Sequence, residues 1–263
     1  MHAFKYHRAS NVNDASSLAK GDARLLAGGQ SLVQAMKLRL SSPTDLIDLG
    51  TIKELSGIKA SGTEVTIGAM TRHAEVAGSP DVKKAIPALA ALAGMIGDRQ
   101  VRAMGTIGGS LANNDPAADY PAAALGLGAT ITTNKRKIAA DDFFKGLYET
   151  ALQPGEVITS VTFPVPRRAG YTKFKNQASR FAIVGVFVAD SANGTRVAVT
   201  GAGPCVFRQK DMEKALSTKF DPSSVASVKQ KADGLNTDLH ASAEYRAHLV
   251  SVMAKRAVES ATK

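Results

Sequence analysis

Short apolar runs that alternate with glycine turns and amphipathic stretches predict a chain of mixed helices and strands. The first such unit reads strand, turn, helix, strand. Its predicted strands are Arg24–Ala27 and Leu46–Leu49, and its predicted helix is Leu32–Leu40, with Pro43 marking the break after the helix. The order of these elements is typical of an α/β subdomain.

The middle of the chain continues the mixed pattern. Strands are predicted at Glu64–Ala69, Ala129–Thr133, Lys137–Ala139 and Val157–Phe163, the second and third forming a hairpin. Helices are predicted at Arg72–Ala77, Ala88–Met95 and Asp119–Leu127. Thr71 is the expected N-cap of the first helix, and Asp81 is expected to cap a helix that ends before Pro87.

The pattern changes after the segment Pro164–Arg168, which contains two prolines and is the best linker candidate. Strands are predicted at Tyr171–Lys175 and Arg196–Thr200, whereas the apolar run Ala182–Ala189 fits either a helix or a strand. Two amphipathic stretches, Lys210–Leu216 and Ala243–Val258, predict helices. We therefore expect a domain boundary at this linker.

Composition narrows the function classes. Hydrophobic residues make up 44% of the 263 residues, and the net charge is +10. A strongly basic chain raises the possibility of nucleic-acid binding, but lysine and arginine are scattered, and the densest cluster, Lys135–Lys137, is interpreted as a solvated hairpin turn. We expect no nucleic-acid partner; the basic surface would suit an acidic partner subunit or an anionic nucleotide.

Cysteine and histidine usage argues against a metal in this chain. The one cysteine, Cys205, excludes an internal disulfide, a Cys-ligated iron–sulfur cluster and a Cys₄ zinc site. The five histidines show no metal-ligand spacing. No nucleophile–base–acid set is visible either, since the pair Asp141–Asp142 is interpreted as a helix cap before Phe143. We expect no catalytic residue and no metal ligand.

The chain contains no apolar run near the roughly 20 residues of a membrane span, and its N-terminus lacks the apolar core of a signal peptide. We expect a cytoplasmic location, with membrane association only through partners.

Two glycine-rich turns carry the most specific chemistry. They are Ala27–Ser31 and Thr106–Ser110, each with a glycine pair followed by a serine after at most one further residue. A glycine pair permits positive φ and the close approach of a ligand to the backbone, and amides before a helix form a phosphate site. Two such turns suggest a dinucleotide, although paired glycines alone more often simply turn the chain.

The sequence around both turns resembles the FAD-binding medium subunits of molybdenum hydroxylases, the family of xanthine dehydrogenase and aerobic carbon monoxide dehydrogenase. The resemblance rests on motifs found in family order along the whole chain: Leu25–Leu40, Gly68–Thr71, Ile96–Ala112, Asp115–Asp119, Pro154–Ile158 and Ala178–Ala182.

The resemblance implies an α+β fold. Residues 1–166 would be a vanillyl-alcohol-oxidase (PCMH-type) FAD-binding domain made of two α/β subdomains, about 1–55 and 56–166. Residues 167–263 would form a C-terminal α/β domain with a small, three-stranded antiparallel sheet.

It also implies cofactor contacts. The first turn and its flanks would hold one end of the FAD pyrophosphate through Leu25, Leu26, Ala27, Gly28, Gly29, Gln30, Ser31 and Leu32. The second turn would hold the other end through Thr106, Ile107, Gly108, Gly109 and Ser110. Asp119 would reach the ribose or adenine, with a helix N-cap as its alternative role.

Three further residues would lie near the flavin. Ile96 and Ile158 would be apolar walls against the ring, and Lys175 would lie close to the isoalloxazine or the ribityl chain, in a register that Asn176 leaves open by one residue. Tyr148 and Tyr171 could stack on the cofactor, although ordinary packing is the favoured interpretation for both.

By resemblance, the chain is an FAD-carrying electron-transfer subunit. A small subunit with two [2Fe–2S] clusters and a large subunit with molybdenum–molybdopterin cytosine dinucleotide would complete a heterohexamer of three subunit types. Electrons would pass through FAD to NAD, a quinone or oxygen. The alternatives are a stand-alone flavin-dependent oxidoreductase of the same FAD fold and a basic nucleotide-binding or RNA-binding module.

Overall fold

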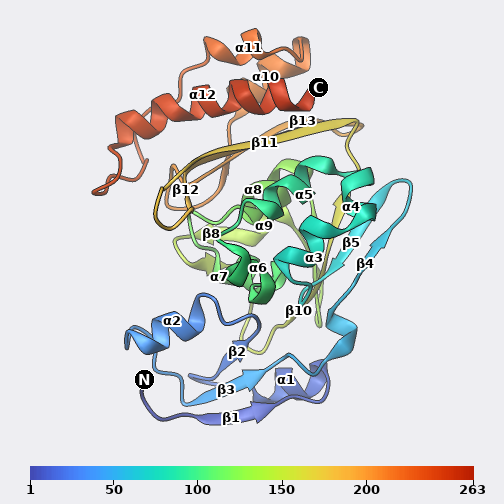
Figure 1. Cartoon of the computed structure of the whole chain (residues 1–263), viewed down its shortest axis with the longest axis vertical. Helices are drawn as coiled ribbons and strands as arrows, with labels where there is room; N and C mark the ends of the chain where they lie inside the picture. Colours follow the sequence, from blue (N-terminus) through green and yellow to red (C-terminus); the bar gives the residue numbers. More distant parts are fainter.

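The three larger of the four β-sheets follow one another along the long axis of the molecule, each built from a separate part of the chain (Figure 1). The computed structural model describes residues 1–263. In Figure 1 the N-terminal sheet lies at the bottom, the middle sheet with its helices lies in the centre, and the C-terminal sheet crosses the top beneath three helices.

The N-terminal sheet is parallel, with the order β1-β3-β2. Its strands are β1 (Lys5–Arg8), β2 (Arg24–Leu26) and β3 (Asp45–Asp48), and its crossover helices are α1 (Val12–Leu18) and α2 (Leu32–Lys37). Parallel neighbours need such crossovers because a tight turn can only reverse the chain. Helix α2 ends earlier than predicted, because Arg39 adopts a φ of 60° and turns the chain away.

The middle sheet is antiparallel and has the order β4-β5-β10-β6-β7. Its strands are β4 (Ile58–Ala60), β5 (Glu64–Gly68), β6 (Thr130–Thr133), β7 (Lys137–Ala139) and β10 (Ile158–Pro164). The predicted hairpin is confirmed, since Thr130 pairs with Ala139. Strand β10 comes from later in the chain and lies between β5 and β6. It therefore joins the β4-β5 and β6-β7 hairpins into one sheet.

Short helices surround the middle sheet. They are α3 (His73–Gly78), α4 (Pro80–Ala85), α5 (Pro87–Gly94), α6 (Arg99–Met104), α7 (Ile107–Asn113), α8 (Tyr120–Leu127) and α9 (Ala140–Phe143). A 3₁₀ turn at Lys53–Leu55 precedes the sheet, and a small ribbon of β8 (Phe144–Gly146) and β9 (Glu149–Thr150) follows α9.

Two predicted helix caps are wrong. The Thr71 hydroxyl hydrogen-bonds to the backbone of Gly57 instead, and the Glu75 carboxylate accepts from the Arg72 N–H at the start of α3. Ser79 rather than Asp81 caps α4, by accepting from the Val82 N–H. Asp81 lies two residues after this cap and instead places its negative charge in the first turn, where the helix dipole favours it.

The C-terminal sheet is antiparallel and has four strands in the order β11-β12-β13-β14, not the three that were expected. The strands are β11 (Arg168–Lys175), β12 (Ala182–Ser191), β13 (Gly194–Thr200) and the very short β14 (Phe207–Arg208). The ambiguous apolar run is therefore a strand, and its burial on both faces explains why it lacks a clear alternation.

The two faces of this sheet are covered differently. Helices α10 (Lys210–Thr218), α11 (Pro222–Ala226) and α12 (Ala243–Ala261) lie on the outer face. The inner face packs on the middle layer, where a Cβ at Gly126 of α8 would come within 2.9 Å of the Phe187 ring. Tyr171, Phe187 and Ala198 join one continuous hydrophobic core with the residues of the middle sheet.

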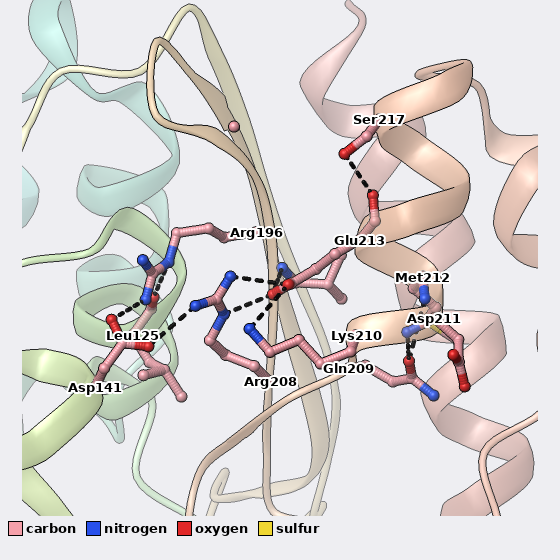
Figure 2. A network of polar contacts seen from close by, with 12 residues as sticks. Leu125, Asp141, Arg196, Arg208, Gln209, Lys210, Asp211, Met212, Glu213 and Ser217 are labelled. Carbon is pink, nitrogen blue, oxygen red and sulfur yellow. Dashed lines mark hydrogen bonds and ion pairs between the residues drawn. The ribbon is translucent and has the colours of Figure 1, made fainter.

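A polar network also joins the C-terminal sheet to the middle layer (Figure 2). The Asp141 carboxylate of α9 pairs with Arg196 of β13 and with Arg208 of β14, the latter at 3.1 Å. Arg196 donates to the Leu125 carbonyl at 2.9 Å, and Arg208 pairs with Glu213 of α10 at 2.7 Å. We call these groups the Asp141 network.

No helix is long and apolar enough to cross a membrane.

Candidate functional site

The two glycine turns lie directly against each other, although more than seventy positions separate them in the sequence. A Cβ at Gly28 would come within 2.1 Å of the Met104 carbonyl oxygen and 2.7 Å of the Gly105 Cα. A Cβ at Gly109 would lie 3.5 Å from that of Ala27. Gly28 is therefore required because another backbone segment occupies the space of a side chain.

The first turn presents a run of open backbone donors. None of the N–H groups of Gly28, Gly29, Gln30 and Ser31 donates a hydrogen bond within the chain. Gly29 has a φ of 73°, which turns the chain just before α2 begins at Leu32. Consecutive amides in such a turn form a concavity that suits an anion, and a pyrophosphate supplies acceptor oxygens for it. Leu25, Leu26, Ala27 and Leu32 flank this turn and are partly buried.

The second turn is built differently from the prediction. The N–H groups of Ile107 and Gly108 donate to the carbonyls of Thr71 and Ala69, and those of Gly109 and Ser110 donate to Thr106. These amides are therefore not open donors, unlike those of the first turn. The Ser110 hydroxyl makes no hydrogen bond within the chain, so the second turn offers this hydroxyl and a close backbone approach rather than a second set of amides.

Asp119 lies in a buried polar cluster. Only 4% of the residue is exposed, and its carboxylate accepts from the Tyr171 hydroxyl at 2.5 Å and pairs with the Lys173 ammonium at 2.9 Å. Burial raises the pKa of this carboxyl, while the Lys173 charge opposes the rise. Asp119 stands at the N-cap position of α8 without capping it. The cluster joins α8 to β11 and so connects the middle and C-terminal layers.

Lys173 is a residue that the sequence reasoning missed. Its ammonium also donates to the Arg180 carbonyl at 2.8 Å, whereas Lys175 is exposed and forms no ion pair. Lys175 is the last residue of β11, where the pairing with β12 shifts register between Phe174 and Lys175. The available signal was the spacing of Tyr171 and Lys173, which puts both on one face of a strand.

The two predicted apolar walls have different surroundings. Ile158 is 6% exposed and belongs to the main hydrophobic core, whereas Ile96 is partly buried. The carbonyls of Ile96 and Gly97 accept from Arg102, and that of Gly97 also accepts from Arg180 of the C-terminal part. Tyr148 is exposed, whereas Tyr171 is buried and packs near Phe187.

No group of three or more His, Cys, Asp or Glu side chains could hold a metal ion. The two turns form a candidate site for a phosphate-bearing ligand, with open amides at one turn and a second turn packed against it.

Comparison with known protein families agrees with a site of this kind. Residues 2–166 match the FAD binding domain in molybdopterin dehydrogenase, and residues 169–261 match the CO dehydrogenase flavoprotein C-terminal domain. The chain belongs to the family of FAD-binding subunits of molybdopterin dehydrogenases.

Named relatives match along nearly the whole chain. The carbon monoxide dehydrogenase medium chain of Afipia carboxidovorans is 36% identical over 98% of this chain and 96% of the relative. The nicotine 6-hydroxylase medium subunit of Paenarthrobacter nicotinovorans is 34% identical over 98% of this chain and 97% of the relative. Both are subunits of oxidoreductases, so the chain is an FAD-dependent oxidoreductase subunit.

Solved structures confirm the fold. A chain of the reconstituted CO dehydrogenase from Oligotropha carboxidovorans superposes with a TM-score of 0.91 at 34% identity, covering 99% of this chain and 98% of that chain. A chain of quinoline 2-oxidoreductase from Pseudomonas putida 86 gives 0.90 at 29% identity, covering 99% and 97%. The expected FAD-binding fold with a C-terminal antiparallel sheet is therefore confirmed.

Proposed function

We propose that this chain carries FAD as the electron-transfer subunit of a multi-subunit molybdenum hydroxylase. It would receive electrons from two [2Fe–2S] clusters of a small subunit and pass them to an external acceptor, which is NAD, a quinone or oxygen. The observation that carries the proposal is the run of four open amides at the first glycine turn, packed against the second turn.

The residues fit FAD in chemical terms. The open amides of Gly28, Gly29, Gln30 and Ser31 would hold a pyrophosphate, and the Ser110 hydroxyl would add a hydrogen bond from the second turn. Ile96 would exclude water beside the ring. When bound, the flavin supplies the redox chemistry that the side chains lack, and the protein supplies binding and orientation.

We further propose that Asp119 contacts the ribose or adenine of FAD, and that Lys175 and Ile158 lie near the flavin. The structure adds Lys173 to this group. Because Lys173 already pairs with Asp119, a ribose hydroxyl at Asp119 would compete with this lysine. The Asp119–Lys173 pair would then hold the C-terminal layer over the cofactor-binding part.

We propose that the division into domains lies between residues 166 and 167, with subdomains at about 1–55 and 56–166.

The partner subunits would carry the substrate chemistry. We propose a large subunit with molybdenum–molybdopterin cytosine dinucleotide, the small iron–sulfur subunit, a heterohexamer and a cytoplasmic location. The relatives named above act in complexes for carbon monoxide and for nicotine. In this proposal the large subunit determines which substrate the complex oxidises.

The test compares the purified chain alone and co-expressed with its partners. Visible absorption after FAD addition and desalting is expected to show equimolar flavin, and the chemically reduced small subunit is expected to bleach that flavin on mixing. A folded chain that binds no FAD even with its partners would refute the proposal. Substrate oxidation by the isolated chain would favour the stand-alone flavoenzyme.

A further inference from the structure

A buried histidine stands directly behind the second glycine turn. His73 begins α3 with 5% of its surface exposed, and its backbone N–H donates to the Gly105 carbonyl at 2.9 Å. A Cβ at Gly105 would come within 2.5 Å of His73 Nε2 and 2.8 Å of Cδ2. The imidazole therefore lies against the bare backbone of Gly105.

Gly105 is in turn the surface on which the first glycine turn rests. The Gly105 Cα would lie 2.7 Å from a Cβ at Gly28, the first of the four residues with open amides. The His73 ring, the Gly105 backbone and the Gly28 backbone thus form three successive layers. A displacement of the ring would therefore press on Gly105, which in turn lies against Gly28.

His73 and its neighbour Tyr120 each carry a buried polar atom that has no partner. His73 Nδ1 and the Tyr120 hydroxyl are both buried and have no hydrogen-bond partner, and the two ring centroids lie 5.3 Å apart. Buried polar groups are nearly always satisfied in folded proteins, and an orphaned N–H is rarer than an orphaned acceptor. Of the two ring nitrogens, Nδ1 is the one that is buried without a partner, so we place the proton on Nε2, at the Gly105 edge, and Nδ1 is then an acceptor.

The two atoms also need complementary partners. The Tyr120 hydroxyl can donate, and an unprotonated Nδ1 can only accept, so one water that accepts from the first and donates to the second satisfies both. Burial and the nearby Arg102 charge lower the pKa of His73 to about 4, which keeps the imidazole uncharged at neutral pH.

We propose that His73, as the neutral Nε2–H tautomer, is a positioning residue for the FAD-binding turns, and that a buried water links its Nδ1 to Tyr120. The His73 ring would act by supporting the Gly105 backbone, which in turn supports the open amides that begin at Gly28. This inference rests on the proposed function, in which these amides hold the FAD pyrophosphate.

The first experiment determines the tautomer of the His73 ring in the full chain without FAD. Histidine ¹⁵N spectra at neutral pH are expected to show His73 with a protonated Nε2 and a bare Nδ1, and a high-resolution crystal structure is expected to place a water between Nδ1 and the Tyr120 hydroxyl. A protonated Nδ1 would overturn the tautomer, and direct contact or empty space between the two atoms would overturn the water.

The second experiment tests positioning with variants. His73→Leu keeps apolar volume but removes both ring nitrogens, and it is expected to weaken FAD binding about tenfold, equivalent to about 1.4 kcal/mol. His73→Gln, which retains a donor, is expected to recover most of the affinity. His248→Leu changes an exposed histidine of α12 and is the matched control.

Amide chemical shifts of Gly28 and Gly105 in the unliganded variants separate positioning from general stability. They are expected to move in His73→Leu and to return toward wild type in His73→Gln. Unchanged shifts together with wild-type FAD affinity in His73→Leu would refute the role. If that variant does not fold, Tyr120→Phe tests the water link by the same two readouts. A wild-type chain that binds no FAD would refute the proposed function, while the spectra would still decide the tautomer and the positioning.

Discussion

At the residue scale, the same residue type has different roles at neighbouring positions. Gly28 is needed because the Met104–Gly105 backbone passes over it, whereas Gly29 is needed because its φ is 73°. Asp119 and Lys173 are charged yet buried, and each is neutralised by the other. Such details depend on which atoms meet in three dimensions, and no sequence pattern distinguishes them.

The first prediction concerns Gly28. We expect Gly28→Ala to lose FAD binding by at least about tenfold and to destabilise the chain by about 2 kcal/mol, because the new methyl group would overlap the Met104 carbonyl. Flavin retained after desalting and urea unfolding measure the two effects. Gly62→Ala is the control, since nothing lies within 4 Å of its Cβ position. Equal flavin content in both variants would contradict the packing of the two turns.

At the element scale, the basic hairpin turn between β6 and β7 differs from its prediction. It was interpreted as merely solvated, but Arg136 pairs with the buried Glu156 at 2.9 Å and donates to the Ala151 carbonyl at 2.6 Å. Thr133 and the Gln153 N–H also donate to the same carboxylate. The turn therefore fixes the segment that leads into the central strand β10.

The second prediction is that Arg136→Ala destabilises the chain at neutral pH, because it leaves the Glu156 carboxylate without its cation, an effect reduced by the exposure of Arg136 to solvent. Lys137→Ala, at an exposed lysine without an ion pair, is expected to change little. Urea unfolding of both variants checks this, and equal stabilities would contradict it.

The same carboxylate gives the stability a defined pH dependence. Hydrogen bonds from Arg136 lower the pKa of Glu156 to about 2, below its usual 4.5. Between these values the unfolded chain binds more protons than the native one, so the contribution of Glu156 is complete above pH 4.5 and is lost as pH falls toward 2. We expect Glu156→Gln to flatten the acid limb of a stability–pH curve; an unchanged slope there would contradict the assignment.

At the scale of the whole molecule, the C-terminal sheet is attached to the middle layer by one hydrophobic core and by two polar clusters. One is the Asp119 cluster with Tyr171 and Lys173, and the other is the Asp141 network (Figure 2). Hydrophobic contact is not directional, whereas charged hydrogen bonds specify one alignment. We infer that the two polar clusters set the register of the layers.

A prediction at this scale uses the Asp141 network. Asp141→Asn is expected to lower the free energy of unfolding by about 1 kcal/mol, because Arg196 and Arg208 lose their shared partner while part of the site stays solvated. Asp142→Asn, at the exposed neighbouring residue, is the control. Thermal unfolding at low and high salt checks this: the difference between the variants should shrink with salt, and a difference that is absent at low salt would contradict it.

Most of the elements follow from the sequence alone, because periodicity, prolines and glycines act locally. The hairpin Thr130–Ala139 and the end of a strand at Pro164 were readable in this way, and motif order identified the family. The sequence also located both glycine turns. These features depend on residues that are neighbours along the chain.

Only the tertiary structure decided which groups meet. The open amides of the first turn, the occupied amides of the second, the pairing of Lys173 with Asp119 and the layering of His73, Gly105 and Gly28 all join segments far apart in sequence. A hydrogen-bond donor is open or occupied according to its acceptors in space, and these acceptors come from distant parts of the chain. Local pattern determined the elements of this protein, and long-range packing determined the chemistry of its site.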